Sequence, residues 1–400
     1  MMRKTTVEAI ANLNKDVGIT GEKGKSLPFV QLGRAVRPDN VVVGTGMADF
    51  DYGILTLGGF PLGTLVTLEG EPSSGKSLIS AMLVASAQEA FGTRLCGWCD
   101  AEQRLNAMGV DFLQSRRVDY EALVLIGSVP QEADPWDHYP VAERVLYSVE
   151  QLCHSGDFSV IVVDSLASLI PMDLWEKAKA HGKSAGPGKK HNVISDEERV
   201  AALPRIYSKW LKMLKPAAEY GNTLVICTTQ MRANIRARRM VSELIARQED
   251  DDKAVGGNAL RFEASQRVRF AIEGDIEENG KVLGEKVCAK LIKSTVSPPR
   301  TVTYKNTPGP ILLYHDGRTV SATESLVWLA AEQGMVQKSG SWYEWKGVKK
   351  QGLRQWAEYL DANVALRDEI EAQVRAQVTL TNTTPEPRRA AIGFGKIGGR

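Results

Sequence analysis

The segment GEPSSGKS, residues 70–77, constrains the fold of this chain more than any other feature of its sequence. It follows the apolar run LVTLEG, opens a helix-like segment at Lys76, and has the spacing GxxxxGK followed by Ser or Thr. In a strand–loop–helix context, glycine backbone N–H groups wrap phosphates, the lysine reaches the terminal phosphates and the hydroxyl binds Mg²⁺. The sequence therefore predicts an ATP and Mg²⁺ site formed by Gly70, Glu71, Pro72, Ser73, Ser74, Gly75, Lys76 and Ser77.

Strand-like and helix-like segments alternate after about residue 40. The apolar runs RLCGWCD, ALVLIG, VIVVD and TLVICTTQ are separated by segments with a helical apolar period, such as PVAERVLYSVEQLC. Short runs rich in Val, Ile and Leu that alternate with helices predict a mostly parallel sheet covered on both faces. The predicted fold class is α/β, a phosphate-loop ATPase core with an N-terminal arm and a small α+β C-terminal domain.

Changes in composition divide the chain into four predicted segments. Two stretches without an apolar period follow strands, and long stretches of this kind are usually functional loops or disordered. The C-terminal part contains SWYEWKG and a predicted helix near 352–377. The predicted segments are an arm and linker (1–39, with a helix at 5–16), the ATPase core (40–310, with loops at 173–199 and 231–257), the small domain (311–378) and a basic disordered tail (379–400).

Charge, hydropathy and cysteine content argue against a membrane protein, a disulfide-rich protein and a protein of strongly one-sided charge. The net charge is only +2, from 50 basic and 48 acidic residues, so a charged partner must be bound by local clusters. The N-terminus lacks an apolar h-region, and the most apolar run, VIVVDSLASLIPM, is interrupted by Asp164, so we expect a soluble cytoplasmic protein without a membrane partner. Cys96 and Cys99 form a CxxC without a second pair, which favours ordinary strand positions over a metal or redox site.

Polar residues at three strand ends are candidates for nucleotide chemistry. Asp164 ends VIVVD, where an acid can hold Mg²⁺ through water, although a lone strand-end Asp is often only a cap. Glu102 follows RLCGWCD, the strand after the phosphate-loop helix, and can position an attacking water, the alternative being a solvent-facing acid. Gln230 ends TLVICTTQ, where an amide can sense a γ-phosphate or simply terminate the strand.

Taken in order, these segments resemble the RecA recombinase family. The matching text is GEPSSGKS, DAE, VIVVDSLASLIP, NTLVICTTQMR and GGNALRFEASQRVRF, and the likeness continues through SGSWYEWKG, covering roughly residues 5–378. The resemblance implies a RecA-type core and an ATP-bound helical filament on single-stranded DNA, with ATP between neighbouring subunits. The loops and tail resemble those of phage-encoded relatives more than those of a typical bacterial chromosomal member of the family.

The resemblance also assigns roles to individual residues. The family's phosphate-loop lysine and hydroxyl correspond to Lys76 and Ser77, and its Mg²⁺-associated acid corresponds to Asp164. Its catalytic glutamate corresponds to Glu102, and its γ-phosphate-sensing glutamine corresponds to Gln230. The helix at 5–16 matches the arm that packs on the adjacent subunit. Phe262 falls on an interface aromatic, with Arg267 nearby on the same expected strand.

Three departures from the family pattern qualify these assignments. The family reaches across the interface with two lysines spaced KxK, whereas this chain has Lys293 followed by Thr295, so hydrolysis is expected to be slower or supported by another residue. The adenine-stacking tyrosine has no clear counterpart. The tail carries Arg388, Arg389, Lys396 and Arg400 where some members have an acidic tail.

Basic residues in and near the two long segments match the DNA-binding loops of the family. The first segment is rich in lysine, and Arg205 follows it. In the second, arginines neutralise phosphates without reading bases, and an isoleucine matches an aliphatic wedge between nucleotide triplets. The predicted DNA-binding residues are Arg205, Arg232, Ile235, Arg236, Arg238, Arg239, Gly256, Gly257 and Asn258.

The predicted function is a DNA-dependent ATPase that pairs single-stranded DNA with a homologous duplex and exchanges strands. Two alternatives stay open at this point. One is a ring-forming helicase of the same core fold, which the arm and the SWYEWKG domain disfavour. The other is a non-catalytic, ATP-gated DNA-coating or mediator protein, which the single Lys293 makes plausible.

Overall fold

The computed structural model describes residues 19–20, 26–27, 41–55, 57–103, 105, 111–114, 116–127, 140–184, 196–230, 257–278, 280–296, 311–314 and 321–383. The chain divides into two compact units, Met1–Val41 and Val42–Arg400. In the first unit β1 (Ile19–Thr20) pairs antiparallel with β2 (Ser26–Leu27). The predicted helix at 5–16 lies outside the described residues, as does the tail after residue 383. The predicted domain boundaries stay predictions.

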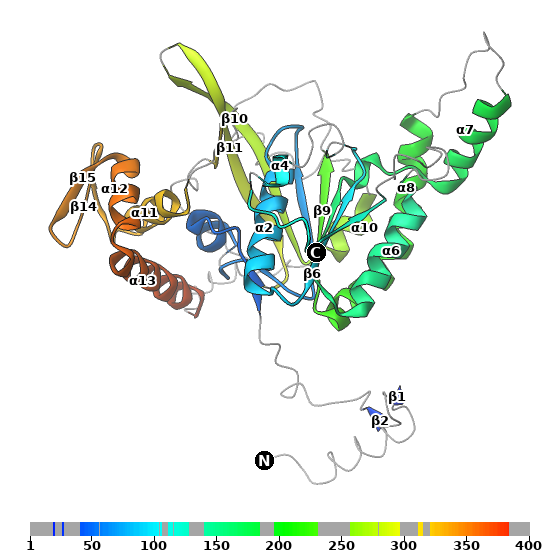
Figure 1. The fold of residues 1–400 in the computed structure, drawn as a ribbon, viewed down its shortest axis with the longest axis horizontal. Coiled ribbons are helices and arrows are strands. Elements are labelled where there is room, and N and C mark those ends of the chain that lie inside the picture. Colours follow the sequence, from blue (N-terminus) through cyan, green and yellow to red (C-terminus); the bar gives the residue numbers. More distant parts are fainter. Residues whose placement is uncertain are drawn as a thin grey trace, which may run out of the picture. The chain divides into compact units, whose positions relative to one another are not determined.

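An eight-stranded sheet forms the centre of the second unit (Figure 1). Its strand order is β12-β11-β10-β5-β9-β8-β6-β7. The strands from β10 to β7 in this order are parallel, whereas β10–β11 and β11–β12 pair antiparallel. The strands are β5 (Leu65–Gly70), β6 (Leu95–Asp100), β7 (Leu123–Ile126), β8 (Phe158–Asp164), β9 (Leu224–Gln230), β10 (Gln266–Glu278), β11 (Lys281–Ser294) and β12 (Ile311–Tyr314). The predicted α/β class with a mostly parallel sheet is confirmed.

Different helices cover the two faces of this sheet. On one face α2 (Lys76–Ala90) buries Ile79 and Leu83 in a cluster with Val66 and Leu68 of β5. On the other face α6 (Ala142–Ser155) and α8 (Asp196–Gly221) pack on each other and on β8. Because both faces are covered, the central strands are continuous apolar runs rather than alternating ones.

The β10–β11 hairpin is longer than the other strand pairs. Figure 1 shows it extending beyond the rest of the sheet. Its far end carries alternating charged residues, and only its base pairs in parallel with β5, from Gln266 to Phe270. The apolar runs of the sequence therefore predicted the parallel strands, whereas this charged hairpin was not anticipated.

The C-terminal part of the second unit has its own core. It comprises α11 (Ala322–Glu332), β13 (Gln337–Ser339), β14 (Trp342–Trp345), β15 (Val348–Gln351), α12 (Gly352–Asp361) and α13 (Val364–Thr383). The three strands form one antiparallel sheet, and Trp356 is fully buried against α11 and α13 residues. The prediction of one helix near 352–377 was wrong. The chain leaves the helix at Ala362, and the Asn363 backbone carbonyl accepts from Leu366 N–H at 3.0 Å to start α13.

Several short elements complete the core. They are β3 (Val42–Val43), the π-helical turn η3 (Asp49–Ile54), β4 (Phe60–Pro61), α4 (Asp111–Gln114) and the 3₁₀ turn η4 (Leu166–Ser168). The Asp49 backbone N–H donates to Ser325 Oγ of α11 at 2.9 Å, and the Ser325 hydroxyl donates to the Asp49 carboxylate. The start of the core is therefore bonded directly to the C-terminal part.

The first predicted loop, 173–199, is partly helical. Helix α7 spans Met172–Ser184, and α8 begins at Asp196. The loop prediction was wrong for these residues, because the stretch DLWEKAKA consists mainly of good helix formers with Asp173 in the first turn, where a negative charge is favoured. Residues 231–256 of the second predicted loop lie outside the described residues, and Gly257 begins α10 (Gly257–Glu263).

No helix in the described ranges combines the length and apolarity needed to cross a bilayer. The two cysteines of the CxxC lie on β6 and are buried, and they belong to the core clusters on opposite faces of the sheet. They cannot ligate one metal ion from these positions, so the preference for ordinary strand positions is confirmed. Burial raises the pKa of the Cys99 thiol to about 12, which keeps it protonated and unreactive.

Candidate functional site

The phosphate loop lies at the carboxyl end of β5, between Gly70 and the start of α2 at Lys76. Gly75 has φ 86° and precedes the helix without a side-chain cap. A Cβ at Gly70 would lie 2.6 Å from the Phe270 carbonyl oxygen and 2.7 Å from Ser74 Oγ, so only glycine fits there. The first N–H groups of α2 thus lack a capping side chain, which makes this helix end suited to an anion.

Lys76 turns its ammonium into this loop. The side chain is 7% exposed, and Nζ donates to the carbonyl oxygens of Gly70 at 3.1 Å and Glu71 at 2.5 Å. Ser77 is half-buried in the first turn of α2. A buried cation inside a glycine-bounded loop, beside a hydroxyl at a helix N-terminus, fits the triphosphate and Mg²⁺ of a bound nucleotide.

Asp164 ends β8, the strand on which α2 packs. Its carboxylate is 7% exposed, and Oδ1 accepts from Thr228 Oγ1 of β9 at 2.5 Å. Asp164 is also the register partner of Asp100 on β6. Hard oxygen ligands are what Mg²⁺ prefers, so the Asp164 carboxylate and the Ser77 hydroxyl have the right chemistry to hold the ion.

Glu102, Ser165 and Gln230 meet at the same edge of the sheet. Glu102 Oε1 accepts from Ser165 Oγ at 2.7 Å and from Gln230 Nε2 at 2.7 Å. Gln230 is the register partner of Gly70, the first residue of the phosphate loop. Two predicted site residues, Glu102 and Gln230, are therefore in direct contact beside the loop. Ser165, the third member, was not predicted to take part, although it directly follows the strand-end acid Asp164.

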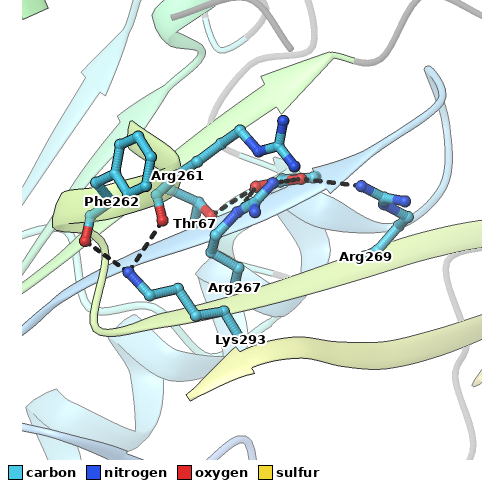
Figure 2. Close-up of polar contacts among 7 residues, drawn as sticks. Thr67, Arg261, Phe262, Arg267, Arg269 and Lys293 are labelled. Carbon is cyan, nitrogen blue, oxygen red and sulfur yellow. Dashed lines mark hydrogen bonds and ion pairs between the residues drawn. The ribbon is translucent and has the colours of Figure 1, made fainter. Parts of the chain in front are cut away.

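Lys293 and Arg267 lie on neighbouring strands of the sheet, and Phe262 lies beside them on α10 (Figure 2). Lys293 Nζ donates to the backbone carbonyls of Arg261 at 2.9 Å and Phe262 at 2.6 Å, at the end of α10. Phe262 is 75% exposed on α10, whereas Arg267 is buried on β10 in an ion pair with Glu69. The expectation that Phe262 and Arg267 share a strand was wrong, because the buried Leu260 anchors residues 257–263 as a helix.

A basic surface lies on the exposed side of α8. Arg205 is exposed there and lines a hollow of about 660 Å³ with Pro204, Ser208, Lys209, Lys212 and Met213. These positions recur at three- and four-residue spacing, so they share one helix face. The sequence prediction named only Arg205; this helical spacing was the signal for Ser208, Lys209 and Lys212. Arg232, Ile235, Arg236, Arg238, Arg239 and Gly256 lie outside the described residues.

Sequence comparisons cover nearly the whole of this architecture. The profile of the RecA N-terminal domain matches residues 5–307, and that of the RecA C-terminal domain matches residues 324–379.

The chain belongs to the RecA family.

Curated relatives agree with this assignment. Protein RecA of Acinetobacter baylyi is 31% identical over 338 residues, which is 84% of this chain and 82% of the relative. Protein RecA of Rhodococcus opacus is 29% identical over 371 residues, which is 92% of this chain and 90% of the relative. Like other RecA proteins, the chain is a DNA-dependent ATPase of homologous recombination and DNA repair. The phage origin stays a prediction.

Proposed function

We propose that this member of the RecA family binds ATP and Mg²⁺ at the 70–77 loop, polymerises on single-stranded DNA, and catalyses homologous pairing and strand exchange. The observation that carries the proposal is the contact between Glu102 and Gln230. It links the candidate hydrolytic acid to the last residue before the second basic segment. The hydrogen bond between Glu102 and Gln230 would therefore couple the state of the bound nucleotide to DNA binding.

Individual residues then have separate tasks at the nucleotide. The loop amides and Lys76 hold the phosphates, and Ser77 and Asp164 hold Mg²⁺, the latter through water. Bound Mg²⁺ supplies positive charge that stabilises the phosphate oxygens during transfer. Glu102 orients and polarises the attacking water, and Ser165 keeps its carboxylate in place. Lys293 is the candidate cation toward a neighbouring subunit's nucleotide.

Gln230 would act as the switch between the two sites. Its amide nitrogen donates to Glu102. When Gln230 turns toward a bound phosphate, Ser165 still donates to Glu102, so the carboxylate stays in place to orient a water. Gln230 directly precedes residues 231–257, which contain the predicted DNA-binding arginines, so a change at Gln230 on nucleotide binding would couple the two sites.

DNA binding would use the α8 surface and the second segment together. Arg205, Lys209 and Lys212 supply positive charge along one helix face, which suits a phosphate backbone and reads no bases. Arg232, Ile235, Arg236, Arg238 and Arg239, with Gly256, Gly257 and Asn258, complete the proposed contacts. The arm (1–39), Phe262 and Lys293 are proposed for subunit contacts within the filament. The same role for Arg267 stays a prediction, since its side chain pairs within its own subunit.

Joint-molecule formation tests the proposal. Homologous and heterologous DNA pairs are compared for the wild type and Lys76→Ala, with ATP and Mg²⁺ present. We expect joint molecules only from homologous pairs and only with the wild type. Equal yields from both pairs would contradict the pairing function. Unwinding of a forked duplex without a homologous partner would favour a helicase, and filaments without DNA-stimulated phosphate release would favour a non-catalytic coat protein.

A further inference from the structure

A group of charged side chains, of which Glu69, Arg267 and Arg269 are buried and Lys293 is half-buried, crosses the sheet beside α10. Glu69 lies on β5, Arg267 and Arg269 on β10, and Lys293 on β11 (Figure 2). The register pairs are Glu69 with Arg269, Thr67 with Arg267, and Arg267 with Lys293. Val66 and Leu68 belong to the core on the α2 side, so Thr67 and Glu69 point to the opposite face. These side chains therefore lie next to one another on a single face.

Glu69 is the centre of this group. Its carboxylate is 2% exposed and accepts from Arg267 Nε at 2.6 Å, Arg267 Nη2 at 2.8 Å and Thr67 Oγ1 at 2.9 Å. Arg269 Nη2 lies 3.7 Å from Glu69 Oε2, the oxygen that also accepts from Arg267 Nη2. A buried carboxylate that accepts two hydrogen bonds from one arginine is held in one geometry, and removing the carboxylate leaves buried guanidinium charge uncompensated.

The two ends of this group are functional elements. Glu69 directly precedes Gly70, the first residue of the phosphate loop. At the other end, Arg267 lies opposite Lys293, and Lys293 Nζ donates to the last carbonyls of α10, including that of the exposed Phe262. A cation at a helix C-terminus satisfies carbonyls that have no partner within the helix. The group thus connects the phosphate loop to the exposed end of α10.

We propose that Glu69 is a positioning residue: by holding Arg267, it keeps Lys293 on the carbonyl end of α10 and so fixes α10 relative to the phosphate loop. The functional meaning of this link rests on the proposed roles of the phosphate loop and Lys293. The link itself is a property of the nucleotide-free chain, and it can be measured without turnover.

The charges around Lys293 predict a change in its pKa that a general loss of stability would not produce. Burial lowers the pKa of the Lys293 amine, Arg267 and Lys215 of α8 lower it further, and Glu263 of α10 raises it. Removing the Glu69 charge leaves the Arg267 guanidinium uncompensated, so the pKa of Lys293 should fall further. If Glu69 only stabilised the fold, its loss would expose Lys293 to water, and the pKa would rise instead.

Three variants of the full chain separate these cases. Glu69→Gln removes the charge, and Thr67→Val removes only one donor to Glu69. Thr229→Val is the matched control, because Thr229 is the register partner of Glu69 on β9 and its buried Oγ1 has no hydrogen-bond partner among the residues that the structure describes. Amide hydrogen exchange is measured without nucleotide at α10 and at α2, on the opposite face. The pH midpoint of amine modification at Lys293 is followed by mass spectrometry.

We expect exchange at α10 to rise about tenfold in Glu69→Gln and about threefold in Thr67→Val, with α2 and the control unchanged. The Lys293 midpoint should move down by about half a pH unit in Glu69→Gln. Equal increases at α10 and α2, or an upward midpoint, would overturn the proposal. If Glu69→Gln does not fold, the test rests on Thr67→Val. Hydrogen exchange at α10 in Thr67→Val that equals the wild-type exchange would then overturn the positioning role of Glu69.

ATP turnover then tests the functional meaning separately. We expect Glu69→Gln to lower kcat while the KM for ATP stays within about twofold, since the phosphate loop itself is intact. Absence of ATP turnover in the wild type would contradict the proposed function and leave the exchange result standing. Normal turnover with unchanged exchange at α10 would overturn the positioning role alone.

Discussion

At the scale of single residues, the site depends on close approaches at the carboxyl ends of parallel strands. Gly70 is the clearest case, since it has β9 and β10 as neighbours and begins the phosphate loop. Glu102 is another, because its one oxygen accepts from both Ser165 and Gln230. Small changes at these positions should therefore affect nucleotide chemistry more than overall stability.

We expect Gly70→Ala to weaken ATP affinity about tenfold or more. The added Cβ would lie 2.6 Å from a backbone carbonyl oxygen of β10, which cannot move without displacing the strand. Gly92→Ala is the control, since its Cβ would meet only an ordinary contact at 3.6 Å. Fluorescent-nucleotide titration measures both affinities. Equal affinities would show that the loop tolerates the side chain.

We expect Gln230→Ala to bind ATP within about threefold of the wild type but to lose ATP's enhancement of DNA affinity. The variant removes the amide that contacts Glu102 and leaves the phosphate loop untouched. DNA affinity is measured by anisotropy with and without a slowly hydrolysed ATP analogue. Ser165→Ala removes the other donor to Glu102 and should keep the enhancement. If Gln230→Ala retains the enhancement of DNA affinity by ATP, the nucleotide and DNA sites are not coupled through Gln230.

At the scale of elements, the sequence predicted what depends on local pattern. The apolar runs gave the parallel strands, and the glycine spacing placed the loop before α2. Helix α7 was missed because its mixed charge hides a helical propensity that no apolar stripe marks. The ion pair of Glu69 with Arg267 could not be predicted, since it joins residues 198 positions apart and depends on strand order.

The α8 surface makes a prediction at this scale. Replacing Lys209 and Lys212 together by Gln should weaken single-stranded DNA binding and lower the steepness of its salt dependence by about 1.4, roughly 0.7 for each lost phosphate contact. Lys281→Gln, an exposed lysine at the far end of the β10–β11 hairpin, is the control for charge. An unchanged salt dependence would show that α8 is not part of the DNA-binding surface.

At the scale of the whole molecule, two buried acids lie where the start of the core contacts the C-terminal part. Asp49 bonds to Ser325 of α11, and Asp51 accepts from Thr45 N–H at 2.8 Å and Gly46 N–H at 2.9 Å. Nearby, Arg375 of α13 lies 5.6 Å from the centre of the Tyr52 ring. Burying two acids within one turn makes the stability of this junction depend on pH.

Burial raises the pKa of Asp51 from 3.8 to about 7, and the Asp49 charge adds to the shift. The folded state therefore binds this proton more tightly than the unfolded chain. The stabilisation is present at low pH and is lost as the pH rises through about 7. We expect the free energy of unfolding of the wild type, relative to Asp51→Asn, to fall by on the order of 2–4 kcal/mol between pH 5 and 8.

Denaturant unfolding of the nucleotide-free chain at several pH values measures this difference. Asp51→Asn keeps the shape of the protonated acid but cannot ionise, so its own stability should vary less with pH over this range, although one backbone donor to the side chain is lost. Asp173→Asn, at an exposed acid in the first turn of α7, controls for the change in net charge. Hydrogen exchange at α11 should rise with pH in the wild type and not in Asp51→Asn, because ionisation of Asp51 beside Asp49 weakens the contact through Ser325. Parallel pH profiles for the wild type and Asp51→Asn would show that Asp51 is already ionised in the fold and that its three hydrogen bonds outweigh its burial.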